Sequence, residues 1–412
     1  MTNNLPVSYD FHGDIPMSVP FSQLAPHDIH LYLDVDNHVG VKTCGQACKH
    51  CWFVNYPKVV NRAFGTDVGV GLFDAFGRKG YKVFPRYTDS FAYGGELMKK
   101  YGLAAARTYF EGEETAPTET MNKGEAWTSG RPLLNEDAQQ LLDIARLAGY
   151  GTITMTYHGV LNDDLTLRGS DEYPIKGVLA GADFERVVRI INDYNARHRG
   201  GGFDGFRIGV GITVGTHNNT RESLSRYLRY FDNMGVCTVR FNKFFDHGYK
   251  HPHLVLSEEQ VRQVYRDLNW LHRNLAFSFQ LGVSEDFGTT GIKEMGFPAH
   301  VGWCRAGRQL FAVIPTAFES TVPSRAGYRY ERIGDIVGCV NVFEPTVGAV
   351  YRKTNLVDGS MDYDWEFFVE EIDKLLAARL TGELKNGCFA RELMDKIDAP
   401  LRKKVIAIES RP

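Results

Sequence analysis

The sequence lacks the segments that would take a protein into or across a membrane. No stretch of its 412 residues approaches the roughly 20 apolar residues of a membrane-spanning helix. Residues 1–10 have no basic region followed by an apolar run, so no secretory signal peptide is expected. We therefore expect a cytoplasmic protein without a membrane partner.

An excess of positive charge is also missing. The 47 basic residues are outnumbered by 50 acidic ones, and the formal net charge is −3. Proteins that grip nucleic acid over a broad surface need a basic face to neutralise phosphates. The balance argues against nucleic acid as a partner, although it leaves room for a local patch.

Cysteine is scarce, and its distribution does not suit a disulfide framework. The chain has seven cysteines, an odd number, and three of them are crowded into residues 44–51. This pattern favours a reducing compartment over a secreted scaffold. At 43% hydrophobic residues, the chain can bury the core of one large domain and a smaller one.

The crowded segment carries the strongest chemical pattern in the sequence. Cys44, Cys48 and Cys51 are spaced so that a tight loop can turn three thiolates toward one point. Three ligands leave one metal position without protein, which is typical of reactive sites rather than structural ones. An iron–sulfur cluster is the favoured interpretation, and a zinc site stays open because His50 or His38 can supply a fourth ligand.

The Cys-x3-Cys-x2-Cys spacing, with His50 just before the third cysteine, resembles the cluster loop of radical S-adenosylmethionine (SAM) enzymes. The resemblance implies a 4Fe–4S cluster on Cys44, Cys48 and Cys51, with SAM chelating the fourth iron. In that family an electron cleaves SAM to methionine and a 5′-deoxyadenosyl radical, which removes a hydrogen atom from the substrate. The family also implies a reduced flavodoxin or ferredoxin as electron donor.

A second motif strengthens the resemblance. Gly94, Gly95 and Glu96 follow an expected strand at residues 82–87. Alone, these residues could be an ordinary turn before a helix. Radical SAM enzymes carry a similar Gly-Gly-Glu after the second strand, where it contacts the amino group of SAM. Glycines allow close approach of the backbone, and a carboxylate pairs with an ammonium group.

Strand and helix patterns alternate along most of the chain, which predicts an α/β fold with a parallel sheet. Ser257 with Gln260, and Asn219 with Glu222, are expected capping boxes at two helix starts. The alternation makes about six strand–helix units, and six units match the partial (β/α)6 TIM-like barrel of radical SAM enzymes. The six strands are expected at residues 29–35, 82–87, 151–158, 207–214, 238–242 and 277–281.

We expect three regions. An irregular arm covers residues 1–28, the partial barrel covers 29–290, and a small α+β extension covers 291–412. The barrel contains an insertion at about 97–133, which is interpreted as a solvated surface segment, with a lid over the substrate as the alternative.

Polar residues end the middle strands of the expected barrel. The resemblance implies SAM contacts at these places, and the candidates are Thr156, His158, Thr213 and Asn218. Turn and cap chemistry is the alternative for Asn218. Met155 and Tyr157 are expected to face packing helices. Arg240 and Asn242 alternate on one strand face and are candidates for contact with the substrate or the SAM carboxylate.

The C-terminal region resembles a twitch or SPASM extension. Such extensions hold auxiliary iron–sulfur clusters, and the candidate ligands are Cys304, Cys339 and Cys388. The first two are farther apart than is usual, and no Cys-x2-Cys follows them. The three cysteines either hold a cluster with an open or non-cysteine ligand, or the cluster is lost and the hairpin is scaffold. Alternatively, Cys388 or Cys304 gives a hydrogen atom to a substrate radical. Cys237 is expected to be a core residue.

The expected function is that of a radical SAM enzyme acting on a small polar metabolite, such as an amino sugar or an amino acid. Residues 1–27 are too short for a leader-peptide-binding domain, which favours this class. Modification of a ribosomal peptide is the alternative, and modification of tRNA is a third. A zinc-stabilised, non-enzymatic interaction protein is the competing class. An enzyme using SAM only as a methyl donor would leave the cysteine loop without a purpose.

Overall fold

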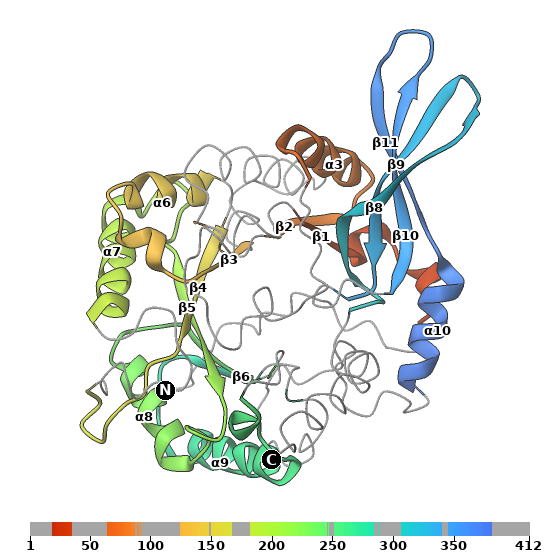
Figure 1. The fold of residues 1–412 in the computed structure, drawn as a ribbon. Coiled ribbons are helices and arrows are strands. Elements are labelled where there is room, and N and C mark those ends of the chain that lie inside the picture. Colours follow the sequence, from red (N-terminus) through yellow and green to blue (C-terminus); the bar gives the residue numbers. More distant parts are fainter. Residues whose placement is uncertain are drawn as a thin grey trace, which may run out of the picture.

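The computed structural model describes an α/β protein built on two sheets (Figure 1). The residues that the structure describes are 19–34, 64–86, 89, 91, 124–147, 150–166, 182–244, 246, 251–283, 287, 306–339 and 345–380. None of the helices in these ranges combines the length and apolarity that crossing a membrane requires.

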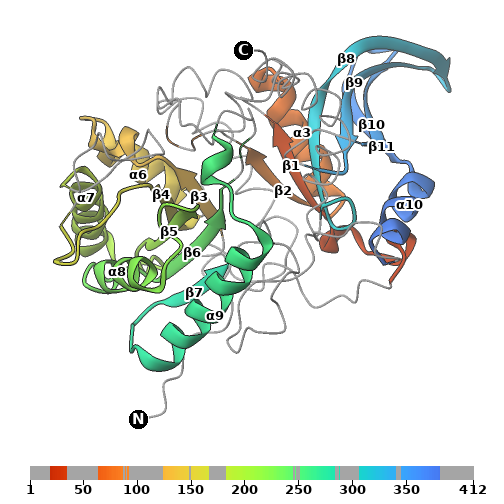
Figure 2. The same ribbon diagram turned by 60° about the horizontal axis from the view of Figure 1, so that its bottom comes forward.

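The first sheet has five parallel strands in the order β3-β4-β5-β6-β7. Four helices lie along the outside of this curved sheet (Figures 1 and 2). The strands are β3 (Gly124–Thr128), β4 (Tyr150–Tyr157), β5 (Arg207–Val214), β6 (Thr238–Lys243) and β7 (Gln280–Val283). The helices are α6 (Ala138–Leu147), α7 (Ala182–His198), α8 (Arg221–Asp232) and α9 (Glu258–Asn274).

The second sheet has six strands in the order β11-β10-β9-β8-β1-β2. Its strand β1 pairs in parallel with both neighbours, and β8 to β11 are antiparallel to one another. Its strands are β1 (His30–Asp34), β2 (Lys82–Arg86), β8 (Leu310–Arg325), β9 (Tyr328–Val337), β10 (Thr346–Asn355) and β11 (Met361–Phe367). The N-terminal part of the barrel and the C-terminal hairpins therefore share one sheet.

Four 3-10 turns and two further helices complete the described elements. The far ends of the β8–β9 and β10–β11 hairpins project from the body (Figure 2) and are joined by a hydrogen bond from Leu356 N to Gly327 O of 2.9 Å. The helices are α3 (Thr66–Arg78) and α10 (Val369–Leu380). The 3-10 turns are η1 (Phe21–Gln23), η2 (Pro26–Asp28), η3 (Arg131–Leu134) and η5 (Pro252–Leu254).

Alternation along the strands decides which side chains form the main core. Ile153, Met155 and Tyr157 of β4 point to the helix-covered face and are fully buried. Tyr157 lies among four aromatic rings of α7 and α8, with centroid distances of 5.1 to 6.2 Å. The expectation that Met155 and Tyr157 face packing helices is confirmed. A separate core lies under the second sheet, around Leu31, Leu33 and Phe311.

The expected fold class is confirmed: the chain forms a partial barrel of parallel strands followed by an α+β region. One strand was missed. β3 lies inside the segment 97–133 that the sequence analysis treats as an insertion, and it adds a fifth strand to the parallel sheet. Its five residues include Gly124 and Glu125, both poor strand formers, so the local signal is weak.

Helix starts show one correct and one wrong capping prediction. Ser257 caps α9, and its box with Gln260 is complete, with bonds of 2.8 and 3.3 Å. At α8 the N-cap is Thr220, whose hydroxyl accepts a hydrogen bond from Ser223 N. The predicted Asn219 cap was wrong by one residue because two adjacent polar residues can both serve as caps.

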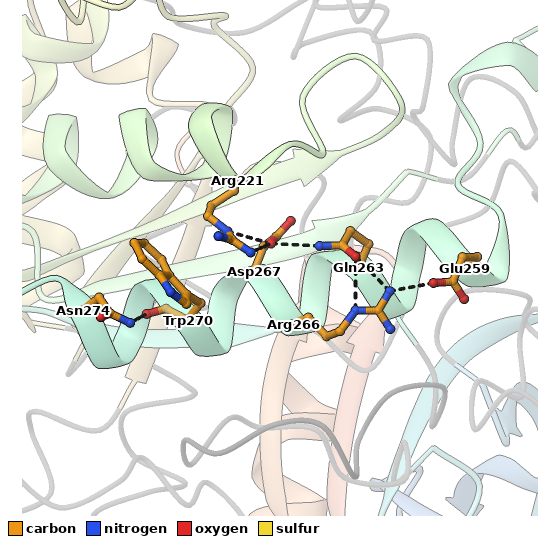
Figure 3. A network of polar contacts seen from close by, with 7 residues as sticks. All are labelled: Arg221, Glu259, Gln263, Arg266, Asp267, Trp270 and Asn274. Atoms are coloured by element: carbon orange, nitrogen blue, oxygen red, sulfur yellow. Dashed lines mark hydrogen bonds and ion pairs between the residues drawn. The ribbon is translucent and has the colours of Figure 1, made fainter.

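A polar network ties α8 to α9 on the outside of the barrel (Figure 3). Asp267 is only 3% exposed, and its Oδ1 accepts hydrogen bonds from Arg221 Nε at 2.8 Å and Gln263 Nε2 at 2.9 Å. The Arg221 guanidinium also lies over the Trp270 ring, 4.8 Å from its centroid. Asp267 of α9 therefore holds the start of α8 in place through its bond to Arg221.

We expect Asp267→Ala to lower the free energy of unfolding by about 2 kcal/mol, because Arg221 and Gln263 both lose a buried, charged acceptor, although water partly hydrates the two donors. Glu259→Ala is the matched control. Its carboxylate pairs with Arg266 at the exposed end of the same helix, and we expect a loss of at most about 0.5 kcal/mol. Urea denaturation measures both, and equal losses would show that Asp267 has no special role.

Candidate functional site

The candidate site lies on the face of the five-stranded sheet that the helices leave uncovered. Side chains on this face alternate with the core residues, and nearly all of them are polar or absent. They are Trp127 on β3; Thr152, Thr154 and Thr156 on β4; Arg207, Gly209, Gly211 and Thr213 on β5; Thr238, Arg240 and Asn242 on β6; and Gln280 and Gly282 on β7.

The strand register brings four of the predicted site residues to the carboxyl half of this face. Thr156 pairs with Gly211, which pairs in turn with Arg240. Thr213 pairs with Asn242 one step farther along the same strands. Side chains at these positions share one face, so the prediction that Arg240 and Asn242 lie on one face is confirmed.

Glycines at the centre of this face make room for the side chains around them. A Cβ placed on Gly211 would lie 3.0 Å from the Asn242 amide nitrogen and 4.0 Å from Trp127 Cζ3. The Arg240 guanidinium carbon lies 5.9 Å from the centroid of the Trp127 ring. An indole, a carboxamide and a guanidinium therefore converge over a glycine. Sequence reasoning missed Trp127, because it lies within the segment treated as an insertion.

Asn218 lies in the turn that follows β5 and is 2% exposed. Its Oδ1 accepts a hydrogen bond from Gly215 N at 2.9 Å, and its Nδ2 donates to Thr213 O at 3.0 Å and to Tyr227 Oη at 3.3 Å. These bonds match the turn chemistry that the sequence analysis kept as the alternative. A role in binding SAM stays a prediction for Asn218, as it does for Thr156, Thr213 and His158, which is 8% exposed beyond the end of β4.

His217 lies half-buried in the same turn, and its buried Nδ1 would be 3.0 Å from a Cβ added to Gly215. Within the described part of the chain, Nδ1 has no hydrogen-bond partner. Burial lowers the pKa of His217 from 6.5 to about 4, because a charged imidazolium would lose its hydration there. The folded state therefore holds this ring neutral.

The depressed pKa sets the sign of a pH effect. Between pH 6.5 and 4 the unfolded chain binds a proton at His217 that the folded chain does not, so stability falls as the pH drops through this window. We expect the wild type to lose about 2 kcal/mol more than His217→Gln between pH 7 and pH 5. Urea denaturation at both pH values measures the difference, and identical slopes for the two proteins would contradict it.

A buried carboxylate that sequence reasoning missed joins the ends of β2 and β3. Asp89 accepts hydrogen bonds from Thr128 Oγ1 at 2.7 Å, Ser129 N at 2.7 Å and Ser129 Oγ at 2.6 Å. It also accepts one from Phe91 N at 3.0 Å, a local turn bond and the only signal that the sequence could have offered. Asp89 thus fixes the start of the segment that leads to Gly94.

Several predicted site residues lie outside the described residues. They are Cys44, Cys48, His50, Cys51, Gly94, Gly95, Glu96, Cys304 and Cys388. Of the three auxiliary candidates only Cys339 is described, and it is 2% exposed just beyond β9. Its neighbour Gly338 packs against Gly307. A Cβ added to Gly307 would lie 3.1 Å from the carbonyl oxygen of Gly338. Gly307 and Gly338 are therefore neighbours in the fold, whereas Cys304 lies outside the described residues.

Outside the predicted cysteine sites, the described ranges offer no other metal centre. No three His, Cys, Asp or Glu side chains among them gather as metal ligands. Cys237, expected as a core residue, is partly exposed at the start of β6, with its Sγ 3.6 Å from Thr238 Oγ1. Cys44, Cys48 and Cys51 lie outside the described residues, and an iron–sulfur cluster held by their three thiolates stays a prediction.

The comparisons with known proteins give similar solved structures but no family. No protein-family model and no curated protein matches the chain. Streptococcus suis SuiB bound to precursor peptide SuiA is similar with a TM-score of 0.46 at 13% identity, covering 85% of this chain and 65% of that one. SuiB bound to S-adenosylmethionine gives 0.44 at 12% identity, with the same coverage. This chain thus spans about 65% of the length of SuiB, and the low scores do not carry SuiB's ligands over to it.

Proposed function

We propose that the protein is a radical SAM enzyme. The observation that carries this proposal is the parallel pairing of β1 with β2, in which Asp34 stands beside Arg86 at the carboxyl ends. In the sequence, Cys44 to Cys51 follow the end of β1, and Gly94 to Glu96 follow the end of β2. Functional loops of parallel α/β barrels follow the carboxyl ends of strands. Two motifs of one cofactor system thus follow two adjacent strands at the same edge.

Different residues hold the cluster, SAM and the substrate in this proposal. Cys44, Cys48 and Cys51 hold a 4Fe–4S cluster, and Gly94, Gly95 and Glu96 hold the amino group of SAM. Together, the cluster and SAM would supply a 5′-deoxyadenosyl radical for removal of a hydrogen atom from the substrate, with the electron coming from an external donor. Asp89 positions the start of the Gly94 segment by tying it to Thr128 and Ser129. The uncovered face of β4 to β6, where Gly209 and Gly211 leave space between the strands, orients the substrate.

Anaerobic reconstitution with iron and sulfide tests the proposal. We expect about four irons in the SAM-cleaving cluster, and 5′-deoxyadenosine when dithionite and SAM are added. The competing zinc-stabilised interaction protein would contain one zinc, stay colourless and leave SAM intact. Stoichiometric zinc without bound iron would therefore overturn the proposal, and transfer of the SAM methyl group without 5′-deoxyadenosine would point to a methyltransferase.

The substrate is proposed in two classes. One class is a ribosomal precursor peptide, and the other is a small polar metabolite such as an amino acid or an amino sugar. SuiB was solved with its precursor peptide, which concerns that protein, yet it makes a peptide the class to test first. Peptides, amino acids and amino sugars are tested side by side. The class that raises the rate of 5′-deoxyadenosine formation above the rate without substrate is the substrate class.

An auxiliary cluster and an external electron donor complete the proposal. The contact between Gly307 and Gly338 supports a shared site for Cys304 and Cys339, which are far apart in sequence. Cys388 is the third proposed ligand. More than about four irons per chain would support such a cluster. A reduced flavodoxin or ferredoxin is the proposed donor, and a cytoplasmic location fits both.

A further inference from the structure

The starting observation is an exposed tryptophan on an otherwise polar face. Trp127 is 37% exposed, while its strand neighbours Ala126 and Thr128 are buried. It is the only large apolar side chain that the structure describes on the uncovered face of the five-stranded sheet. An indole in this position stabilises no described core, so its apolar surface is available to a ligand.

Two polar groups from β6 come to the same place. Arg240 lies over the Trp127 ring, with 5.9 Å from the guanidinium carbon to the ring centroid. Asn242 and Trp127 both approach the point where a Cβ of Gly211 would lie, at 3.0 and 4.0 Å. Because Gly211 has no side chain, these three groups reach across β5 toward one another. Their residues are more than a hundred positions apart in the chain and meet only in the fold.

Arg240 brings a basic group to the carboxyl half of this face, where the register places it between Gly211 and Gly282. At the amino end of the face, Arg207 stands beside Thr152, and Thr152 stands beside Glu125. A guanidinium flanked by a carboxamide offers several N–H donors in one region, which suits a carboxylate. The adjoining indole suits a flat or apolar group beside that carboxylate.

We propose that Trp127, Arg240 and Asn242 form a subsite that binds a carboxylate of the substrate, with the group next to it packed on the indole. The assignment of the ligand as the substrate rests on the proposed function, whereas the binding of a carboxylate does not. The carboxylate can belong to a free amino acid or to an acidic residue of a peptide. Arg240 pairs with it, Asn242 donates a hydrogen bond, and Trp127 sets the preference for a flat neighbour.

The test uses two small probes of the same shape with the reconstituted protein in the presence of SAM. Hippurate has an aromatic ring and a carboxylate, and N-benzoylglycinamide replaces the carboxylate with a neutral amide. By calorimetric titration we expect hippurate to bind about tenfold more tightly than the amide, and Arg240→Gln to remove this preference. Arg240→Lys should retain part of it, and Trp127→Ala should weaken both probes. Arg229→Gln, on the exposed side of α8, is the matched control and should change nothing.

A second pair of probes separates the two sources of the carboxylate. Acetylated and amidated pentapeptides with a central Phe-Glu or Phe-Gln differ only in one charge. Preference for the Glu peptide would assign a peptide side chain, and preference for free phenylalanine over its amide would assign an amino acid.

Equal binding of hippurate and its amide to the wild type would overturn the subsite, and this arm needs no variant to fold. If Arg240→Gln weakens SAM binding about tenfold and leaves hippurate unaffected, Arg240 belongs to the SAM site and the inference is wrong. Failure of the proposed function looks different: hippurate would still bind selectively, but the protein would contain no iron and produce no 5′-deoxyadenosine.

Discussion

Replacing Cys44, Cys48 and Cys51 together with alanine will abolish formation of 5′-deoxyadenosine and remove about four irons per chain. Three thiolates are the only protein ligands that the motif offers a cluster, and alanine offers none. Iron, sulfide and zinc are measured after anaerobic reconstitution, alongside the product of SAM cleavage. The loss of activity should exceed about a thousandfold, because the cofactor supplies the chemistry and the protein has no substitute for it.

Cys237→Ala is the matched control for this variant. Cys237 lies at the start of β6, and its Sγ is 3.6 Å from Thr238 Oγ1. We expect this variant to keep all its iron and its activity. About four irons remaining in the triple variant would locate a second cluster on Cys304, Cys339 and Cys388. An unchanged iron content with full SAM cleavage would contradict the assignment of the cysteine loop.

Tyr157→Ala will lower the free energy of unfolding by about 4 kcal/mol, the largest effect that we expect from a single core substitution. The side chain is fully buried, and the rings of Phe184 and Phe231 lie 5.2 and 5.1 Å from its own. Removing it leaves a cavity between the sheet and helices α7 and α8, and the surrounding rings can close it only in part. Urea denaturation measures the loss.

Tyr157→Phe is the control that separates packing from the hydroxyl group. It keeps the ring contacts, so we expect a loss below about 1.5 kcal/mol. If Tyr157→Ala also cost less than this amount, the aromatic cluster could not be what holds α7 and α8 on the sheet.

The local sequence pattern was enough to predict the strands in which apolar and polar or small residues alternate most clearly. Ile153, Met155 and Tyr157 recur at every second position of β4, and β-branched residues do so in β5, so both strands were predicted, as was the buried face of Met155 and Tyr157. The short β3 was missed, because strand formation there depends on pairing with β4 rather than on its own residues.

The polar residues show the limit of sequence reasoning more sharply. Asn218 was left with two interpretations, and its hydrogen bonds to Gly215, Thr213 and Tyr227 favour the turn. Asp89 offered only the local turn bond to Phe91 as a signal, since its other partners Thr128 and Ser129 lie 39 and 40 residues farther along the chain. Hydrogen bonds of this kind depend on how strands are ordered in a sheet, which no local pattern records.

The sequence by itself determined the cysteine spacing on which the proposed cluster rests, and the alternation of side chains along the strands. A spacing of three cysteines within one loop needs no partner from elsewhere, and alternation is a local property of a strand. Only the tertiary structure decided that β1 lies between β2 and β8, and that Trp127 meets Arg240 above Gly211. Those contacts join residues far apart in the chain, and they form because parallel register, curvature and an absent side chain place them together.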